Sequence, residues 1–406
     1  MISKDFRVLQ LSGAYIGAQK QIEDAIHTEL KQRGIASKVL YLVGNSNDPD
    51  YIQCETRIEN LFRRAAYKYI TKSHVFSRVQ TKRIIKQISA FKPDIFHIHT
   101  IHHGYIDYPL LFNYLNENNI GIVFTVHDMW PFTGGCYHFS EIKCQEFING
   151  CKKCCNPGER HDCSLKRTEK NYQRKMSCYE NARHISFVSV SSWVNQQLEK
   201  SPLAKYPHFV IHNGIVLPRY QSDYCSAMTK TIQPMIEGKK VLLFVASSWD
   251  QGKGYQDICN LAVSLGEGYL LLMVGNASDA IKAKSNNNMY FTGYVRNKND
   301  LHYLYRISDL HVSASKEETF GMTFVEAAIA GTKSVGYNET AISETIHSVG
   351  GICVSSNQRD ALYKAIIEHI NDGKLSASEI EKVKLEYSEK NMAVKYLAVY
   401  EDMIQE

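Results

Sequence analysis

Residues 313–331 read SASKEETFGMTFVEAAIAG, and their pattern predicts a loop that passes into a short apolar helix ending at Gly331. Two carboxylates, Glu318 and Glu326, are separated by seven residues that include a Thr-Phe-Gly-Met-Thr turn. The first backbone N–H groups of a helix are unpaired and carry partial positive charge, so they attract phosphate. Gly321 allows a ligand to approach the backbone closely. Either both glutamates face one ligand, one at each end of its phosphates, or the segment is an ordinary surface helix with two solvated glutamates.

Length and composition predict a soluble protein of two domains, since 406 residues are enough for two cores. No apolar run approaches the length of a transmembrane helix. The first residues, MISKDFRVLQLSG, lead directly into a short apolar run that indicates a β-strand and not a secretory signal. We therefore expect a cytoplasmic protein. The net charge of +5 is too small to indicate a nucleic-acid partner, but it permits attraction to anionic ligands or to a membrane surface.

Strand and helix patterns alternate along the chain, which is typical of parallel sheets. Phe6–Ser12 reads as a buried strand, Gln19–Gln32 as a helix and Ser37–Val43 as a second strand. Further strands are expected at Pro93–Thr100, Ile122–His127, His184–Ser191, Phe209–Ile211, Lys240–Ala246, Tyr269–Val274, Met289–Thr292, Leu310–Ser313, Lys333–Val335 and Gly351–Val354. Further helices are expected at Gly254–Leu265, Lys298–Ser308, Asp360–Asn371, Ala377–Tyr387 and Asn391–Ile404.

The two α/β sets join near His212–Pro218 and predict two doubly wound, Rossmann-like domains. The first covers residues 1–211, and the second covers residues 212–387. In open sheets of this type, ligands bind beyond the carboxyl ends of the strands. We therefore expect the site in a cleft between two facing sheets.

Three segments, at predicted strands or at the turns that follow them, carry candidate site residues. His127 directly follows the strand IVFTV, where it either meets a ligand or serves as a hydrogen-bonded structural histidine. His97 and His99 are separated by Ile98 on their strand, so both point to one face. Each of them either binds a ligand or serves as a structural histidine. Lys253 stands between two glycines at a strand-to-helix turn. A lysine in such a turn is well placed to bind a diphosphate. The alternative is a flexible turn in which the lysine is solvated.

The segment Asn60–Ala90 contains eight Lys and Arg residues and no Asp or Glu, interleaved with apolar residues. It predicts a basic amphipathic helix that is broken near Thr71–Ser73. Such a helix either lies on an anionic membrane surface or forms the solvated face of an ordinary domain helix.

Seven of the eleven cysteines lie between Cys136 and Cys178, so they form a local feature. A tetrahedral structural zinc site fits a C-x2-C pair with two further cysteines within twenty residues, here Cys136, Cys144, Cys151 and Cys154. Cys155 and Cys163 lie close by, and a disulfide knot or reduced thiols are the alternatives. A closed four-thiolate site has no open position for water, so no catalytic role is expected there.

Taken together, these motifs resemble the retaining glycosyltransferases of family four, which have the GT-B fold. The resemblance covers essentially the whole chain. It rests on the 313–331 stretch, IHNGI at 211–215, VASSWDQGKG at 245–254 and the final helix with Tyr396 and Tyr400. HDMWPFTGGC at 127–136, with the cysteine-rich insertion 136–163, is similar to a subset found in bacterial surface-polysaccharide gene sets. The resemblance also implies that the final helix, residues 388–406, crosses back to pack on the first domain.

The resemblance implies a role for each matching residue. Glu318 would contact hydroxyls of the donor sugar, and Glu326 would bind the ribose of the nucleotide. The diphosphate would be held by backbone groups of one turn, namely Phe320, Gly321, Met322 and Thr323. Lys253 would neutralise the diphosphate as the sugar leaves. His127 would hydrogen-bond the transferred sugar or the region of its leaving oxygen, and Gly17 would let the acceptor loop approach the phosphate closely.

Two departures from the family pattern change these expectations. The arginine usual near the turn of the second domain is replaced by Gly252 and by Ser247–Ser248. Charge neutralisation would therefore depend more on Lys253, or on Arg296. The first loop, SGAYIGAQK, also lacks the usual paired glycines around Gly17.

The sequence thus predicts a retaining glycosyltransferase that needs no catalytic metal and carries a structural zinc site. It would move a sugar from a UDP- or GDP-sugar to a glycan or polyprenyl-linked acceptor in surface polysaccharide synthesis. The expected location is the cytoplasm, with peripheral contact to the inner membrane face and no nucleic-acid partner. The alternatives are a nucleotide-sugar epimerase or phosphorylase on the same scaffold, or a non-catalytic zinc-binding interaction module.

Overall fold

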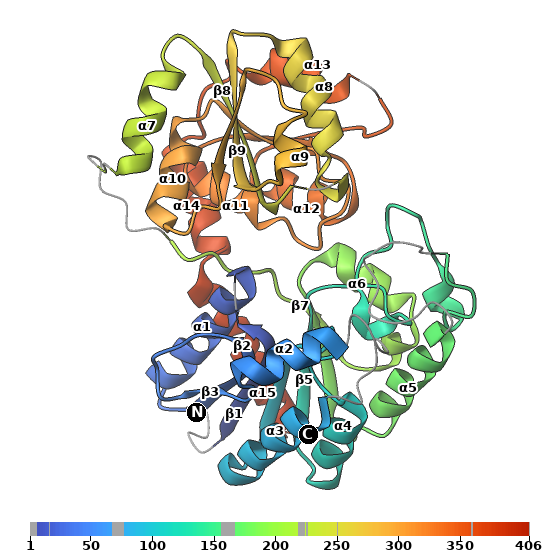
Figure 1. The fold of residues 1–406 in the computed structure, drawn as a ribbon. Helices are drawn as coiled ribbons and strands as arrows, with labels where there is room; N and C mark the ends of the chain where they lie inside the picture. Colours follow the sequence, from blue (N-terminus) through green and yellow to red (C-terminus); the bar gives the residue numbers. More distant parts are fainter. Residues whose placement is uncertain are drawn as a thin grey trace. The chain divides into compact units, whose positions relative to one another are not determined.

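The computed structural model consists of two compact units, Met1–Gly214 with Glu389–Glu406, and Ile215–Ser388 (Figure 1). The structure describes residues 6–15, 17–66, 77–155, 167–217, 224, 226–249, 251–358 and 360–405. Within this part of the chain, no helix is both long and apolar enough to span a bilayer. The sequence placed the boundary at 211/212, and contacts divide the chain after Gly214.

The first unit is built on a parallel sheet that has seven strands in the described residues, in the order β3-β2-β1-β4-β5-β6-β7. The strands are β1 (Arg7–Tyr15), β2 (Ala36–Gly44), β3 (Tyr51–Gln53), β4 (Ile95–Thr100), β5 (Gly121–Val126), β6 (Ile185–Ser189) and β7 (His208–Val210). Every residue of β4, β5 and β6 is buried, as expected for strands covered by helices on both faces. The described helices before Gly214 in this unit are α1 (Gly17–Gln32), α2 (Arg57–Ala66), α3 (Arg78–Phe91), α4 (Tyr108–Glu117), α5 (Thr168–Glu180) and α6 (Ser192–Glu199).

The final helix, α15 (Glu389–Gln405), packs on the first unit. Its buried face includes Tyr396, Leu397 and Tyr400, which share a core with β1 and α1. The prediction that this helix returns to the first domain is therefore confirmed.

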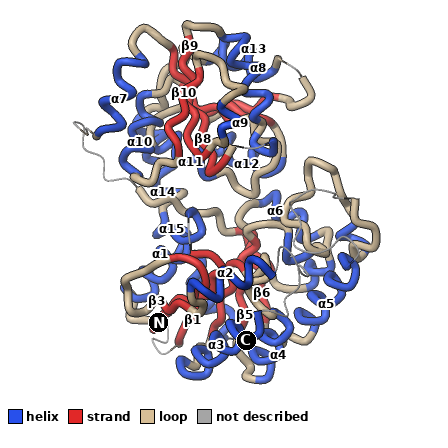
Figure 2. The backbone as a smooth tube through the Cα atoms, viewed as in Figure 1, coloured by secondary structure: helices blue, strands red, loops and turns tan. Residues whose placement is uncertain are grey.

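The second unit contains a six-stranded parallel sheet in the described residues, in the order β10-β9-β8-β11-β12-β13. Figure 2 draws its strands β8, β9 and β10 in red. The strands are β8 (Lys240–Ser248), β9 (Tyr269–Asn276), β10 (Met289–Gly293), β11 (Leu310–Ser313), β12 (Ser334–Tyr337) and β13 (Ile352–Val354). The helices are α7 (Ala227–Ile236), α8 (Tyr255–Leu265), α9 (Asp279–Lys282), α10 (Lys298–Ile307), α11 (Met322–Ile329), α12 (Thr340–Ser348), α13 (Ala361–His369) and α14 (Ala377–Glu386). Separate apolar clusters cover the sheet, one around α8 and α13 and the other around α10.

Both sheets reverse their strand order beside their first strand, between β1 and β4 and between β8 and β11. The prediction of two doubly wound α/β domains is thus confirmed. At such a reversal, the loops leaving the two neighbouring strands diverge to opposite faces and leave a crevice for a ligand. A ligand site is therefore expected at the segments after β8 and β11, and at those after β1 and β4.

Several elements differ from the sequence-based expectation. Strand β3 and helices α4, α5, α6, α7, α9 and α12 were not predicted. The predicted basic helix Asn60–Ala90 corresponds to two described helices, α2 and α3. Its expected break near Thr71–Ser73 lies outside the described residues.

Candidate functional site

The turn after β8 and the loop after β11 meet at the strand reversal of the second unit. Gly254 has φ +68°, and a β-carbon there would lie 2.1 Å from the carbonyl oxygen of Ala314. A glycine is therefore needed for the two backbones to approach this closely. The approach places Lys253 Nζ 2.6 Å from Glu318 Oε1. The side chains are 31% and 27% exposed, respectively, so both charges remain accessible to a ligand.

The loop after β11 is held in place before it enters α11. The backbone N–H of Glu318 donates to Thr340 Oγ1 at 3.1 Å, and Thr345 Oγ1 donates to the carbonyl oxygen of Phe320. Gly321 then takes φ +89° and caps the helix, where a β-carbon would lie 2.7 Å from the Phe324 ring. These contacts fix the direction of the first N–H groups of α11, which have no carbonyl partner within the helix.

Glu326 lies in the second turn of α11 and lines a separate small hollow. Tyr305 donates its hydroxyl to Glu326 Oε2 at 3.1 Å, and Lys298 Nζ lies 3.5 Å from Oε1. Burial and the Glu326 charge raise the pKa of Tyr305 above its ordinary value, so the phenol stays protonated and can donate. The Glu326 side chain is 16% exposed. The rest of the wall is largely apolar and includes Ile215, Val216, Leu301 and Ile329.

The other predicted residues of this unit divide into two groups. Met322 and Thr323 form the first turn of α11, beside Phe320 and Gly321, as the sequence predicted for one continuous turn. Arg296 lies in the loop between β10 and α10 and is exposed. Among the described residues it makes no ion pair, and the structure does not join it to the Lys253–Glu318 pair.

In the first unit, His127 follows the last residue of β5 and is partly exposed. Its Nε2 lies 3.2 Å from Nδ1 of His99, whose Nε2 lies 3.0 Å from Oε1 of Gln10. His97 lies next to His99, with a ring-centroid distance of 4.0 Å. Burial lowers the pKa of His127 to about 4 and lowers the pKa of both other histidines well below the ordinary value, so all three are neutral at pH 7.

His97 and His99 have a structural role, which is one of the two roles expected from the sequence. Tyr400 Oη lies 2.6 Å from His97 Nδ1, and Thr125 Oγ1 lies 2.7 Å from His97 Nε2. The Thr125 hydroxyl is also 3.0 Å from Tyr396 Oη. Tyrosines of α15 thus hold the histidine of β4, which ties the returning helix to the sheet.

Gly17 is the first residue of α1, beside the strand reversal of the first unit. It has φ +61° and is exposed, and a β-carbon there would meet no atom within 4 Å. A glycine is favoured here by backbone conformation and not by crowding. Its predicted approach to a phosphate stays a prediction.

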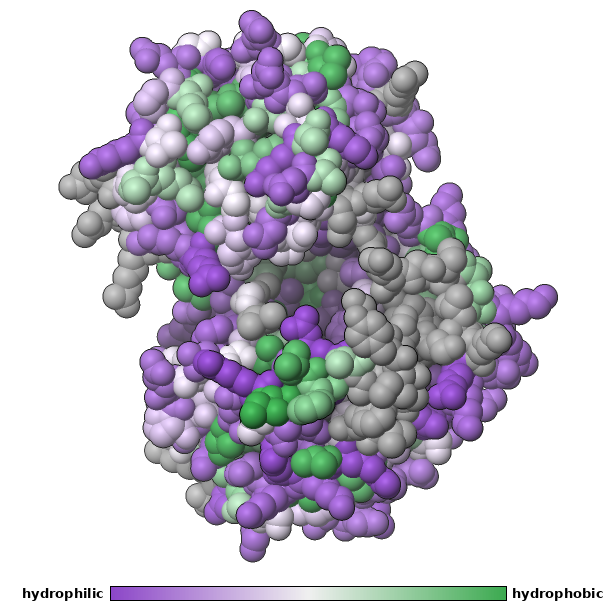
Figure 3. Space-filling view, in the orientation of Figure 1, coloured by the Kyte–Doolittle hydropathy of each residue, from purple (hydrophilic) through white to green (hydrophobic). Residues whose placement is uncertain are grey.

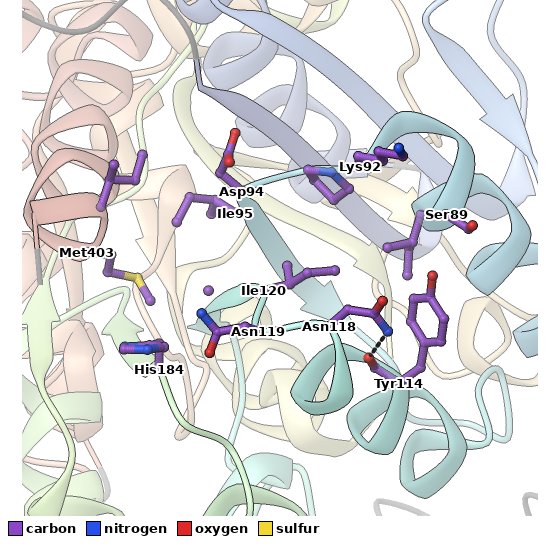
Figure 4. A pocket seen from close by; sticks show the side chains of 14 residues that line it. Ser89, Lys92, Asp94, Ile95, Tyr114, Asn118, Asn119, Ile120, His184 and Met403 are labelled. Atoms are coloured by element: carbon purple, nitrogen blue, oxygen red, sulfur yellow. Dashed lines mark hydrogen bonds between the residues drawn. The ribbon is translucent and has the colours of Figure 1, made fainter.

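A cavity of about 580 Å³ opens at the other edge of the first sheet (Figure 4). Asp94, Gly121 and His184 lie in its wall, at or just before the first residues of β4, β5 and β6. These are the amino ends of the strands, opposite the end that carries His127. The cavity therefore adds nothing to the candidate site.

The two halves of the chain match two family models. Residues 24–219 match the family described as Glycosyltransferase Family 4, and residues 229–385 match the family described as Glycosyl transferases group 1. The chain is a glycosyltransferase. The match in the second unit includes Lys253, Glu318 and Glu326, and the match in the first unit includes His127.

The chain is also similar to several known proteins and structures. A Klebsiella pneumoniae protein described as "Uncharacterized 41.2 kDa protein in cps region" is 20% identical over 329 residues, which are 78% of this chain and 81% of that protein. A glycosyltransferase structure from Rickettsia africae is 18% identical, covers 98% of both chains and has a TM-score of 0.67. WaaG, a glycosyltransferase involved in lipopolysaccharide biosynthesis, is 14% identical over 97% of this chain and 99% of its own, with a TM-score of 0.64.

One further structure contains bound ligands. Anabaena Alr3699/HepE in complex with UDP and glucose is 13% identical over 98% of this chain and 100% of its own, with a TM-score of 0.63. At such identities, the likeness shows the shared fold, which is the GT-B arrangement of two Rossmann-like units. The fold class predicted from the sequence is confirmed.

Of the four predicted zinc ligands of this glycosyltransferase, Cys136 and Cys151 are buried, and Cys144 and Cys154 are partly exposed. Cys151 Sγ accepts a hydrogen bond from the backbone N–H of Gly134 at 3.1 Å. The four predicted cysteines, 136, 144, 151 and 154, do not form a group of mutually close metal ligands in the described residues. Cys163 lies outside the described residues. The four-thiolate set is therefore not assembled here, and zinc binding stays a prediction.

In the described part of the glycosyltransferase, one group of three ligand-type side chains does come within 4.8 Å, namely His27, Asp48 and Asp50. Lys31 Nζ lies 2.6 Å from Asp50 Oδ2, and this ammonium group lowers the pKa of Asp50. The carboxylate is thus already paired with a cation.

Several site residues were not found from the sequence. Tyr305, Lys298 and Thr340 hold the two glutamates but come from other helices, and their residue types are common on any helix. Gln10 lies within the apolar strand β1, and its amide side chain is buried there. A buried polar side chain needs partners, so its position in β1 pointed to a hydrogen-bond network.

Proposed function

We propose that this glycosyltransferase moves a sugar from a UDP- or GDP-sugar to a glycan or polyprenyl-linked glycan, with retention of the anomeric configuration. The observation that carries the proposal is the Lys253–Glu318 pair, which lies at the strand reversal of the second sheet, just before the start of α11. This combination offers positive charge for a diphosphate and a carboxylate for sugar hydroxyls. The UDP and glucose complex of the Anabaena protein and the lipopolysaccharide role of WaaG support the same substrate classes.

The barrier to glycosyl transfer is set largely by the departure of the nucleoside diphosphate from a carbon that becomes cation-like. Stabilising the negative charge on the leaving phosphates lowers that barrier most directly. The Lys253 ammonium and the N–H groups at Gly321, Met322 and Thr323 supply that charge from the protein itself. We therefore propose a reaction that needs no catalytic metal, in which the acceptor attacks from the side of the leaving group.

The two glutamates act on different parts of the donor. Glu318 accepts hydrogen bonds from sugar hydroxyls once the donor displaces part of its contact with Lys253. Glu326 accepts from the ribose hydroxyls, while Tyr305 and Lys298 hold its carboxylate in one orientation. His127 is proposed to contact the transferred sugar and Arg296 to supplement the phosphate charge. Gly17 is proposed to accommodate the acceptor loop.

Replacing Glu326 by alanine is expected to weaken nucleoside diphosphate binding about 10- to 100-fold, because hydrogen bonds to a charged group contribute about 1.5–3 kcal/mol. Titration calorimetry with UDP and GDP measures this. The 2′-deoxy nucleotide should bind the wild-type protein more weakly, but should lose little further affinity in the Glu326→Ala variant. Glu381→Ala, on an exposed helix face of the same unit, is the control. Equal affinity of wild type and Glu326→Ala would remove the ribose assignment.

Membrane contact is proposed for the face of α2 that carries Ile58, Leu61 and Phe62. These side chains are 69%, 69% and 71% exposed, and their spacing places them on one side of the helix. Exposed Arg57 and Arg64 lie on the same helix. Figure 3 shows hydrophobic side chains gathered over α2. An apolar helix face flanked by arginines suits an anionic bilayer surface.

Flotation with anionic and neutral phospholipid vesicles tests this contact. The wild-type protein should float with anionic vesicles at low salt, and the Ile58→Ser/Leu61→Ser/Phe62→Ser variant should bind at least about tenfold more weakly. Salt should weaken the binding of both proteins, since the arginine attraction is screened. Val263→Ser, which changes a 69% exposed residue of the second unit, is the matched control. No flotation of the wild type at low salt would remove the proposal.

A further inference from the structure

We propose that Gln10 and His99 fix the ring proton of His127 on Nε2, so that His127 presents Nδ1 as a hydrogen-bond acceptor and recognises a sugar hydroxyl. The assignment of the proton depends only on the first unit. The identity of the ligand group rests on the proposed function.

The first step is the orientation of the Gln10 amide. Gln10 is fully buried in β1, and its Nε2 donates to the backbone carbonyl oxygen of Glu23 at 3.2 Å. A carbonyl oxygen can only accept, so the NH₂ group must face Glu23. The amide oxygen of Gln10 therefore faces His99, at 3.0 Å from its Nε2.

The second step is the tautomer of His99. An amide oxygen also only accepts, so the His99 proton must lie on Nε2. Burial keeps His99 neutral at pH 7, and a neutral imidazole carries a single ring proton. Nδ1 of His99 is then left with a lone pair. The neighbouring His97 ring, with a centroid 4.0 Å away and both nitrogens bound to other side chains, restrains rotation of the His99 ring.

The third step is the tautomer of His127, which is set by the unprotonated Nδ1 of His99. Its Nε2 lies 3.2 Å from the lone pair of His99 Nδ1, and the two rings are within 24° of parallel. His127 must therefore donate through Nε2. Since its pKa of about 4 keeps it neutral at pH 7, its Nδ1 carries no proton. That nitrogen has no hydrogen-bond partner among the described residues, and His127 is partly exposed.

A lone pair at this position selects the ligand group. A phosphate oxygen and Nδ1 are both acceptors and repel each other, whereas a sugar hydroxyl donates to Nδ1 and gains a hydrogen bond. His127 is thereby assigned to the sugar and not to the diphosphate. Gln10 and His99 are positioning residues, because they act on the ligand only through His127.

Nitrogen NMR of protein labelled with ¹⁵N-histidine tests the proton assignment directly. The histidine signals are assigned by comparison with His127→Asn and His99→Asn variants. In wild type at pH 7, one-bond N–H couplings are expected at Nε2 of both residues, with a coupling across the hydrogen bond from His127 Nε2 to His99 Nδ1. A proton found on Nδ1 of either histidine would overturn the proposal. This readout does not depend on substrate, so it can fail or succeed independently of the proposed function.

Gln10→Leu tests the origin of the restriction. Without the amide oxygen, His99 can move its proton to Nδ1, and a population of His127 with its proton on Nδ1 should appear. Gln80→Leu removes another buried amide of the same unit, 4% exposed, and should leave the His127 signals unchanged. If Gln10→Leu does not fold, the wild-type spectrum still decides the direction of each bond. An unchanged His127 tautomer in folded Gln10→Leu would show that Gln10 does not set it.

Discussion

Replacing Lys253 by methionine is expected to lower kcat about 100- to 1000-fold while the protein remains folded. Lys253 Nζ lies 2.6 Å from Glu318 Oε1, and Glu318 precedes the start of α11, where we propose that charge on the leaving diphosphate develops. Its side chain is 31% exposed, so loss of the ion pair should change stability by less than about 1 kcal/mol. The rate of nucleoside diphosphate release at saturating donor, with water as acceptor, measures the effect.

Two further variants test whether the positive charge must be at position 253 and whether a different cationic side chain can supply it. Lys316→Met removes a lysine of the loop after β11, which is 44% exposed and lies 3.6 Å from Asp257. It should change kcat less than about threefold, because the exposed Lys316 ammonium lies next to Asp257 and is screened by solvent. Lys253→Arg should retain more activity than Lys253→Met, since it keeps the charge. Full activity of Lys253→Met at saturating donor would show that this lysine does not stabilise the leaving group.

Replacing Gly254 by alanine is expected to destabilise the second unit by about 3 kcal/mol and to abolish most of the activity. The added β-carbon would lie 2.1 Å from the carbonyl oxygen of Ala314, a backbone atom that cannot move without shifting β11. Relief of this clash separates the two loops and takes Lys253 away from Glu318. Urea unfolding followed by circular dichroism, together with donor hydrolysis rates, measures both effects.

The matched control is Gly238→Ala in the same unit. Gly238 has a similar φ of +71°, but a β-carbon there would meet no atom within 4 Å. Its substitution therefore introduces only the strain of a left-handed backbone conformation, about 1 kcal/mol. Equal stability losses at Gly254 and Gly238 would mean that the close approach of the two loops is not required.

The fold was predictable because its signals are local and repeated. The buried strands read as short apolar runs, and Gly254, Gly321 and Gly331 mark the turns that begin and end helices. The final helix was found from the spacing of Tyr396 and Tyr400, both of which are fully buried. The strand order follows from these elements only together with the general preference of α/β chains for right-handed crossovers.

The candidate site was predictable only in part, for a physical reason. Glu318 and Glu326 lie in one segment, so their spacing is visible in the sequence. The contact of Lys253 with Glu318 joins positions 65 residues apart, and Tyr305 reaches Glu326 from another helix. Such contacts depend on how the strands are ordered in the sheet, which residue types alone do not encode.

The cysteine-rich insertion shows the limit of spacing arguments. The C-x7-C-x6-C-x2-C pattern counts residues along the chain, whereas a tetrahedral metal site requires sulfur atoms close together in space. Gly150 and Cys151 both have positive φ, so the chain turns sharply within the segment. Such turns decide which sulfurs meet, and the residue count does not contain them.

Hydrogen–deuterium exchange with and without UDP or GDP tests the central claim most directly, because it locates the bound nucleotide on the chain. One of the two nucleotides should slow exchange in peptides that cover the Gln251–Lys253 turn and the Ala314–Ile329 segment, which carry the Lys253–Glu318 pair and the first N–H groups of α11. Glu326→Ala should require a higher nucleotide concentration for the same protection. Protection confined to the first unit, or no protection with either nucleotide at millimolar concentration, would contradict the assignment of the donor site.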